Sequence, residues 1–191
     1  PPSLSALEIT ASPARASGTL RPHAHAPRNH LRAHHDDPRG AGLRAALAAH
    51  RSLRGVQVSA GVQSVQGAEV VDGEETLVQI AAKNEFGTER IPSRPWLRTA
   101  LQVNAKKWRR LAGDVVKAAR TDQGPEPALR VLGVVMVGDC RESLLDGDWA
   151  PNAPMTIARK GSDQPLVDTG RLNQSQRAQV AIPGKGADRL G

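Results

Sequence analysis

The chain has 191 residues, enough for one domain with a buried core and an additional arm. Only 39% of the residues are hydrophobic, whereas 18 Gly and 14 Pro indicate many loops. The formal net charge of +7 is compatible with an acidic partner or with nucleic acid, but the basic residues are spread along the chain and form no block typical of a nucleic-acid footprint.

The composition also narrows the function classes. The single cysteine, Cys140, excludes an internal disulfide framework and a cysteine-rich zinc site. No apolar run approaches the ~20 residues that cross a membrane, and the first residues contain no apolar core of a signal peptide. We therefore expect a soluble protein, made in a reducing compartment and not bound to a membrane.

Residues 1–42 differ in kind from the rest of the chain. They are rich in Pro, carry five of the six His and show no apolar periodicity, which predicts an extended or disordered arm. A metal site would need rigidly placed ligands with a second shell of hydrogen bonds, and this Pro- and Gly-containing setting offers none, so we predict no metal. The five histidines are His23, His25, His30, His34 and His35.

The next stretch predicts a helix, a strand and a second helix. Leu43, Leu47 and Leu53 with interspersed Ala predict a short amphipathic helix over residues 42–53, and apolar residues alternate with polar ones over 56–62 as in a half-buried strand. Residues 64–75 are a Gly- and acid-containing connection. Thr76 is a plausible N-cap for a helix that runs to Lys83.

A rigid corner follows, from Asn84 to Trp96. Gly87 is placed to end the preceding helix in a left-handed cap. Pro92 and Pro95 hold the chain extended, since each fixes its own φ and restricts the residue before it. The only Phe, Phe86, and one of three Trp flank the corner, which indicates a structural joint or a docking edge for a partner.

Two long helical patterns come next and predict an antiparallel pair that packs against the sheet. The first runs from Trp96 to about Arg120 with one apolar face, and the second runs from Pro125 to about Leu145 with Cys140 on its apolar face. The basic residues of the first helix could face a phosphate backbone or an acidic subunit, although such a run is more often a solvated face. These residues are Lys106, Lys107, Arg109, Arg110 and Lys117.

The C-terminal part is predicted to hold a second rigid loop and a strand. Trp149 lies in a Gly- and Pro-rich loop over 146–154, and a short turn over 156–160 is closed by Gly161. A helical turn at 172–175 and a strand around 178–182 follow, and residues 183–191 are expected to form a flexible tail. The fold class is therefore α+β, a small sheet packed against a two-helix pair.

No catalytic residue or cofactor site is predicted. Asp168-Thr169-Gly170 is the signature of aspartic proteases, but that chemistry needs two carboxylates that share a proton, and Arg171 follows where Ser or Ala is usual. The alternative is that Asp168 and Thr169 cap the turn that begins near Gly170. No His follows His50, so nucleophile–His arrangements within the folded domain are excluded, and no phosphate-binding loop or dinucleotide fingerprint is present.

Two segments resemble a known family. Asn84-Glu85-Phe86-Gly87-Thr88 followed by Ile91-Pro92-Ser93-Arg94-Pro95-Trp96-Leu97 resembles the NEFGT…IPxRPFL signature of tailed-phage neck and tail-completion proteins, of the minor tail protein Z type and related virion-morphogenesis families. The second segment is similar to the W-x-P-N/L…T-x-x-R-K-G…P-L-I/V-D-T-G-x-L run of the same proteins. It comprises Trp149, Pro151, Asn152, Thr156, Arg159, Lys160, Gly161, Pro165, Leu166, Val167, Asp168, Thr169, Gly170, Arg171 and Leu172.

The resemblance covers about residues 43–182, with small departures. Trp96 stands where Phe is usual, Gln174-Ser175-Gln176 replaces a common Ser-Ile, and residues 1–42 have no counterpart. What it implies is a structural protein of the virion, assembled in the host cytoplasm as a homo-oligomeric ring, commonly hexameric, at the head–tail junction. Such a ring contacts other neck and tail proteins, including the tail terminator, the tail tube and the head-closure ring, while DNA passes through its lumen without specific binding.

The resemblance further implies that the two motifs shape interfaces or core joints. Phe86, Pro92, Arg94, Pro95 and Trp96 would form one of them, and Trp149, Arg159, Lys160, Asp168 and Arg171 would support the second loop, with an ion pair from Arg159 or Arg171 to Asp168 conceivable. An alternative of equal weight is that the aromatic residues of these motifs only stabilise the fold of the single subunit and take no part in an interface. The alternative function is a basic module that binds nucleic acid without sequence preference.

Overall fold

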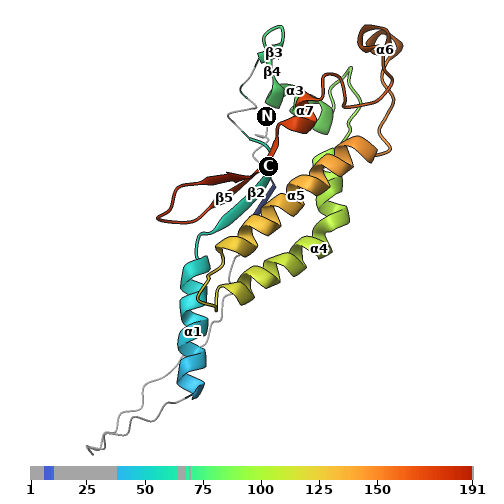
Figure 1. Ribbon diagram of the computed structural model, residues 1–191. Helices are drawn as coiled ribbons and strands as arrows, with labels where there is room; N and C mark the ends of the chain where they lie inside the picture. The colour runs from blue at the N-terminus through green and yellow to red at the C-terminus, as the bar shows by residue number, and fades with distance from the viewer. Residues whose placement is uncertain (1–6, 11–37, 64–67, 69, 191) are drawn as a thin grey trace, which may run out of the picture.

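The computed structural model describes residues 7–10, 38–63, 68 and 70–190, and the elements named below lie in these ranges. The predicted α+β class is confirmed (Figure 1). The strands are β1 (Leu7–Thr10), β2 (Gln57–Val62), β3 (Val70–Asp72), β4 (Glu75–Thr76), β5 (Gln176–Ala181) and β6 (Asp188–Leu190). The helices are α1 (Pro38–Leu53), α3 (Leu77–Phe86), α4 (Trp96–Ala118), α5 (Glu126–Asp146), α6 (Pro154–Lys160) and α7 (Arg171–Gln174).

The main sheet has the order β1-β2-β5-β6 with antiparallel pairing throughout. In the central pair, Val58 lies opposite Val180 and Ala60 opposite Ala178, and all four side chains are buried. Their neighbours along the strands point to the other face, because side chains in a strand alternate. One face of the sheet is therefore apolar and packs against helix.

That helix is α5, which lies directly on β2 and β5, while α4 packs on α5 (Figure 1). The predicted two-helix pair thus meets the sheet mainly through one of its members. Gly133 of α5 allows the close approach, since a Cβ on this residue would lie 3.0 Å from the Cβ of Ala178. The core between the layers includes Trp96, Trp108, Met136 and Cys140, and the burial of Cys140 agrees with its place on the predicted apolar face.

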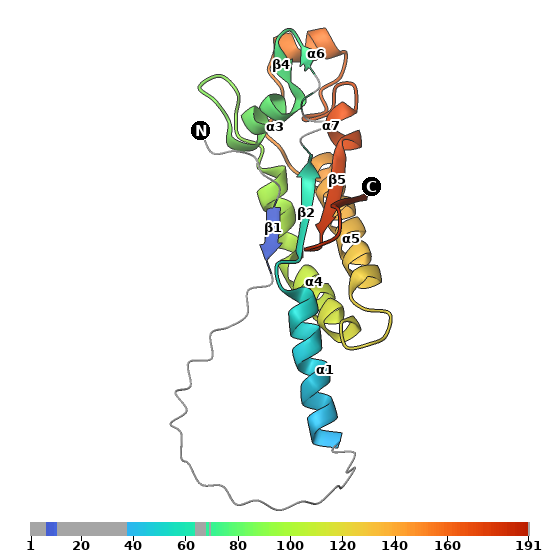
Figure 2. The same ribbon diagram turned by 90° about the vertical axis from the view of Figure 1, so that its left-hand side faces the viewer.

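The remaining elements sit at the two ends of this layered body. The β3–β4 hairpin, α3, α6 and α7 gather at one end, and α1 projects from the other (Figures 1 and 2). The hairpin lies in a stretch that the sequence predicts only as a connection. Thr76 caps α3 as predicted, in a capping box in which its side chain accepts from the Gln79 amide and the Gln79 side chain accepts from the Thr76 amide.

Three predictions need correction at the ends of the chain. The expected flexible tail contributes β6, which pairs with β5 and brings the half-buried Leu190 onto the core. The boundary predicted at residue 42 falls inside α1, which begins at Pro38, and residues 7–10 of the expected arm form the edge strand β1. The rest of that arm, with His23, His25, His30, His34 and His35, lies outside the described residues.

Candidate functional site

The corner between α3 and α4 is built on a tight loop over residues 87–94. Gly87 has φ 77° and ψ 170°, so its φ is positive as predicted but the residue is not in the left-handed helical region, which corrects that part of the expectation. A Cβ here would lie 2.9 Å from the Ser93 amide nitrogen, and only glycine fits without a backbone shift. Thr88 closes the loop, because its amide donates to Ile91 O at 2.8 Å and its hydroxyl accepts from the Ile91 amide.

Glu85 caps the following helix from inside the core. Its side chain is only 1% exposed, and its carboxylate accepts from the backbone amides of Leu97 and Arg98 at 3.0 and 3.2 Å. The Arg98 guanidinium completes the arrangement with an ion pair to the same carboxylate at 2.9 Å. The residue immediately before α4 is Pro95, which has no side chain that could cap the helix. The carboxylate of Glu85 in the preceding helix therefore accepts from the free backbone amides and stabilises the positive end of the helix dipole.

Arg94 joins the two motif segments that lie more than 50 residues apart in the chain. The side chain is 5% exposed, and its Nε donates to Ala150 O at 2.8 Å while Nη2 donates to Pro151 O at 3.1 Å and to Asn152 Oδ1 at 3.4 Å. Its Nη1 donates to Asn84 Oδ1 at 3.0 Å, and the Arg94 amide donates to Asn84 O at 2.7 Å. The planar guanidinium therefore fixes the position of one loop relative to the other.

The second motif segment begins with a turn around Trp149. The indole Nε1 donates to Leu144 O at 3.2 Å, and the ring lies so close to Gly147 that a Cβ there would be 2.2 Å from it. Helix α6 follows and ends at Gly161 in the left-handed conformation. Leu166 then adopts a φ of 61°, which is rare for a residue with a branched side chain and marks local strain in the motif.

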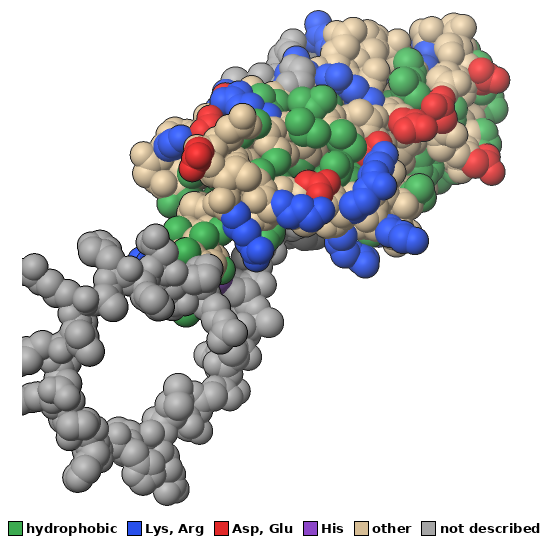
Figure 3. Space-filling model, turned by 60° about the horizontal axis from the view of Figure 1, so that its bottom comes forward, with side chains coloured by type: hydrophobic (Ala, Val, Ile, Leu, Met, Phe, Trp, Pro, Cys, Tyr) green, Lys and Arg blue, Asp and Glu red, His purple; other side chains and the backbone are tan. Residues whose placement is uncertain are grey.

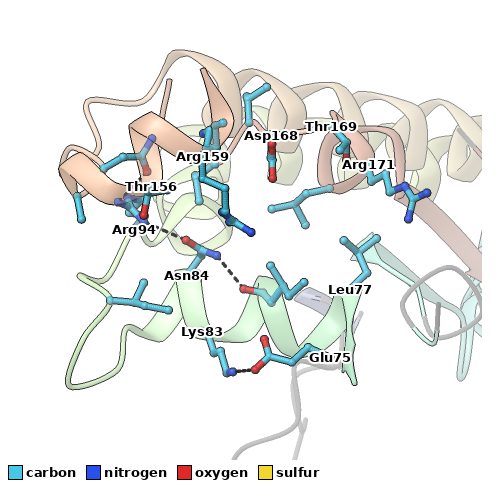
Figure 4. A pocket seen from close by; sticks show the side chains of 18 of the residues that line it. Glu75, Leu77, Lys83, Asn84, Arg94, Thr156, Arg159, Asp168, Thr169 and Arg171 are labelled. Atoms are coloured by element: carbon cyan, nitrogen blue, oxygen red, sulfur yellow. Dashed lines mark hydrogen bonds and ion pairs between the residues drawn. The ribbon is translucent and has the colours of Figure 1, made fainter. Parts of the chain in front are cut away.

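A pocket of about 520 Å³ lies between the two motif segments, and its walls come from α3, the 90–94 loop, α6 and residues 166–172 (Figure 4). Its apolar lining consists of Leu77, Ile80, Ile91, Pro92, Leu166, Val167 and Leu172. Its basic residues are Lys83, Arg90, Arg94, Arg159, Lys160 and Arg171, against the acidic Glu75 and Asp168. The pocket is therefore electropositive, and burial lowers the pKa of both Arg94 and Lys160.

The Asp168-Thr169-Gly170 signature faces this pocket without forming the predicted cap. The N-cap of α7 is Gly170, with φ 76° in the left-handed region, and no side chain bonds to the cap. Asp168 and Thr169 are exposed and line the pocket beside Arg159 and Arg171 (Figure 4). A glycine in this conformation already turns the chain into the helix, so the two polar side chains are not needed for the turn.

The motif residues divide into those that the fold brings together and those that it leaves outside. Trp96 is fully buried, with its backbone oxygen accepting from Ser143 Oγ at 2.8 Å, so it is the large anchor that the sequence predicts. Phe86 is 45% exposed and lies under the Arg98 guanidinium at 5.1 Å from the ring centre. Of the two roles expected at this corner, a structural joint or a docking edge, the buried Trp96 fits the joint, whereas the exposure of Phe86 leaves the docking edge open for that residue.

A buried polar cluster between α4 and α5 was not predicted. The Asp139 carboxylate, 6% exposed, accepts from Trp108 Nε1 at 2.6 Å and pairs with Lys107 Nζ at 2.5 Å. The acidic residue sits on the face of α5 that packs on α4, where the sequence pattern alone suggests an apolar residue. The one available signal was Trp108, because a buried indole N–H usually needs an acceptor.

The remaining candidate groups for chemistry are the thiol of Cys140 and clusters of metal-ligating side chains. Burial, with the nearby charges of Asp139 and Glu85, raises the pKa of the Cys140 thiol to about 12, which opposes any role as a thiolate. Among residues 7–10, 38–63, 68 and 70–190, no group of three or more His, Cys, Asp or Glu side chains is placed to hold a metal. None of the described helices combines the length and apolarity needed to cross a bilayer.

No family model, curated protein or solved structure matches the chain.

Proposed function

We propose that the protein is a structural component of a tailed-phage virion that assembles as a ring, commonly of six copies, at the head–tail junction around the DNA channel. The observation that carries the proposal is the Arg94 joint, in which the two segments with the neck-protein resemblance meet in one rigid unit. The two segments that carry the resemblance are thus also in physical contact, which supports a common structural role for them. The role is structural and involves neither catalysis nor a cofactor.

A ring requires the same heterologous contact to repeat until it closes. The shape of the chain suits such contacts, because α1 projects from one end (Figure 2), while the electropositive pocket is lined by elements at the other end. The remaining faces of the ring would contact the tail terminator, the tail tube or the head-closure ring. A modest positive charge of +7 suits a lumen that DNA passes without being held.

The test is the mass of the purified protein in solution, measured by light scattering with and without residues 1–42. A closed ring of about six copies, with a mass that no longer rises with concentration, is the expected result. Removal of residues 1–42 also takes away β1 and the start of α1, so loss of the ring shows that this part of the chain connects subunits only if the shortened chain keeps its helical circular dichroism. A monomer that also fails to bind preassembled tail tubes or a tail-terminator ring would refute the proposal.

A basic module that binds nucleic acid is the second candidate, and one face of α4 favours it. At helical spacing this face presents Arg98, Lys106, Arg109 and Lys117, and Arg120 follows just beyond the end of the helix; all five are exposed. Lys106, Arg109 and Arg120 form no ion pair with another described residue. This function predicts that the isolated subunit binds duplex DNA with an affinity that falls steeply with salt and falls further in the Lys106→Glu/Arg109→Glu variant, whereas the ring protein binds DNA only weakly.

A further inference from the structure

Helix α1 carries an apolar stripe that nothing described in its own chain covers. Leu43 is 62% exposed and Leu47 is 48% exposed, and the two lie one turn apart on the same face. A helix of 16 residues is about 24 Å long, and α1 extends away from the layered body rather than along it (Figure 2). Large exposed leucines on a projecting helix mark a surface that is covered in an assembly.

The outer face of α5 carries a second uncovered stripe. It consists of Val131, Val134, Gly138, Glu142 and Leu145, which follow one another at intervals of three or four residues. Val131 and Val134 are each 55% exposed, and Leu145 is 37% exposed. Figure 3 shows that hydrophobic side chains gather between charged ones on the face of the domain turned to the viewer. Gly138 leaves a flat place in this outer α5 stripe, since no atom lies within 4 Å of a Cβ built on it.

The charges of the two stripes are complementary. From Pro38 to Arg54 the chain has no acidic residue, and its C-terminal end carries the exposed Arg51 and Arg54. The outer α5 stripe ends in the exposed acids Glu142 and Asp146, and neither forms an ion pair with another described residue. Arg51 and Arg54 lie at the C-terminal end of α1, and Glu142 and Asp146 lie at the C-terminal end of α5, so a parallel arrangement brings these opposite charges together, although α1 also carries the exposed Arg44 next to Leu43.

We propose that α1 of one copy docks on the outer α5 stripe of the neighbouring copy. In the parallel register that places Leu43 beside Val131, Leu47 lies beside Val134 and the gap at Gly138, and Arg54 lies beside Glu142. Each leucine then fills a depression between helix residues, as knobs fill holes in other parallel helix pairs. The contact is heterologous, so it can repeat around a ring; in this respect the inference rests on the proposed ring assembly.

The first experiment measures the association of the full chain by sedimentation velocity over a wide range of concentration. Leu47→Asp places a charge on the apolar stripe, and Gly138→Met fills the gap on α5; each is expected to weaken association about tenfold or more. The matched controls lie on α4. Val103→Asp alters an apolar side chain that is 74% exposed, and Gly113→Met alters a helical glycine with equally open space, so both controls should associate like the unmodified chain.

The second experiment asks whether the contact joins different copies. Arg51→Glu/Arg54→Glu gives a chain that is acidic at both surfaces, and Glu142→Arg/Asp146→Arg gives a chain that is basic at both. Each variant alone is expected to stay dissociated, because like charges meet at every contact. An equimolar mixture is expected to assemble, since each charged end then meets its opposite in an alternating ring.

The outcomes separate the two proposals. If the unmodified chain associates but Leu47→Asp and Gly138→Met leave its mass unchanged, the α1–α5 contact is overturned while the ring stands. The contact is also overturned if Val103→Asp and Gly113→Met weaken association as much as the two test variants do. It is likewise overturned if the mixture of the two charge-reversed chains assembles no better than either chain alone, which is the result expected when α1 folds onto the α5 of its own chain. If the unmodified chain stays monomeric throughout, the contact fails, and the ring fails with it when the chain also does not bind preassembled tail tubes or a tail-terminator ring.

Discussion

Replacing Arg94 should separate the two motif segments while leaving both helices intact. In Arg94→Met a side chain of similar length keeps the aliphatic packing but removes all donors. The oxygens of Ala150 and Pro151 then lose their partner, and the side chains of Asn84 and Asn152 each lose one. Arg94 is 5% exposed, but Asn84, Ala150 and Asn152 are half-buried and Pro151 is exposed, so water can replace only part of the lost donation.

The expected cost follows from the number and kind of bonds lost. Each side-chain hydrogen bond contributes about 1 kcal/mol net, and a buried acceptor left without a donor costs about 1–3 kcal/mol. The four bonds share one side chain and are not additive, so we expect a loss of about 4 kcal/mol in the free energy of unfolding. Domains of this size are stable by about 5–15 kcal/mol, so the variant should fold but with a much lower urea midpoint.

The assay is urea unfolding followed by tryptophan fluorescence, because Trp96 and Trp108 are buried and report on loss of the core. Arg94→Lys keeps the charge but offers one point of donation in place of a planar fork, so it should lose about 2–3 kcal/mol. Arg109→Ala, on the exposed face of α4, should stay within about 0.5 kcal/mol of the unmodified protein. A loss of less than about 1 kcal/mol in Arg94→Met would show that the joint does not hold the motifs together.

Three further predictions concern the same framework. Glu85→Gln removes the charge that caps α4 and should lower the free energy of unfolding by about 1–2 kcal/mol, with a larger loss at low salt than at high salt. An equal loss at the two salt concentrations would rule out an electrostatic contribution to the cap. Gly147→Ala forces the Trp149 ring to move, so it should lower the free energy of unfolding by about 1–3 kcal/mol and shift the tryptophan emission to the red. The control Gly138→Ala, in open space, should not destabilise the protein, and an unchanged emission spectrum for Gly147→Ala would contradict the contact between Gly147 and Trp149. Burial raises the pKa of the Cys140 thiol from an ordinary 9.0 to about 12, so with rising pH the thiol ionises in the unfolded chain before it does in the folded one. The free energy of unfolding should therefore fall between pH 9.0 and about pH 12, by up to about 1.4 kcal/mol per pH unit, and Cys140→Ala should remove this fall. Alkylation of this thiol at about pH 8 should accordingly be slow in the folded protein and fast in urea, and equal rates would disprove the burial.

Local sequence signals predicted most of the elements correctly. The alternation over 56–62, the apolar periodicity of the two long helices and the Thr76 cap each depend on neighbouring residues alone, and each is confirmed. The sequence also indicated that Gly87 needs a positive φ and that Trp96 is an anchor. These features arise from backbone geometry and from the size of one side chain, which the tertiary structure does not change.

Other features depend on residues that are distant in the chain. The polar Asp139 on an otherwise apolar face is explained only by Trp108 and Lys107 across the helix pair. The tail forms β6 because β5 offers it an open edge, and Phe86 stays exposed because Glu85, its neighbour, takes the inward position to cap α4. No local pattern encodes such partners.

The sequence by itself determined the helices, the central strands and the two motif segments, because helical and strand periodicity and glycine and proline geometry act over a few residues. Only the tertiary structure decided that Arg94 joins the two segments and that a pocket opens between them. It also decided which stripes remain uncovered, since exposure is the result of how α4, α5 and the sheet stack. The physical reason is that burial and hydrogen bonding of a side chain depend on everything packed around it, whereas local conformation does not.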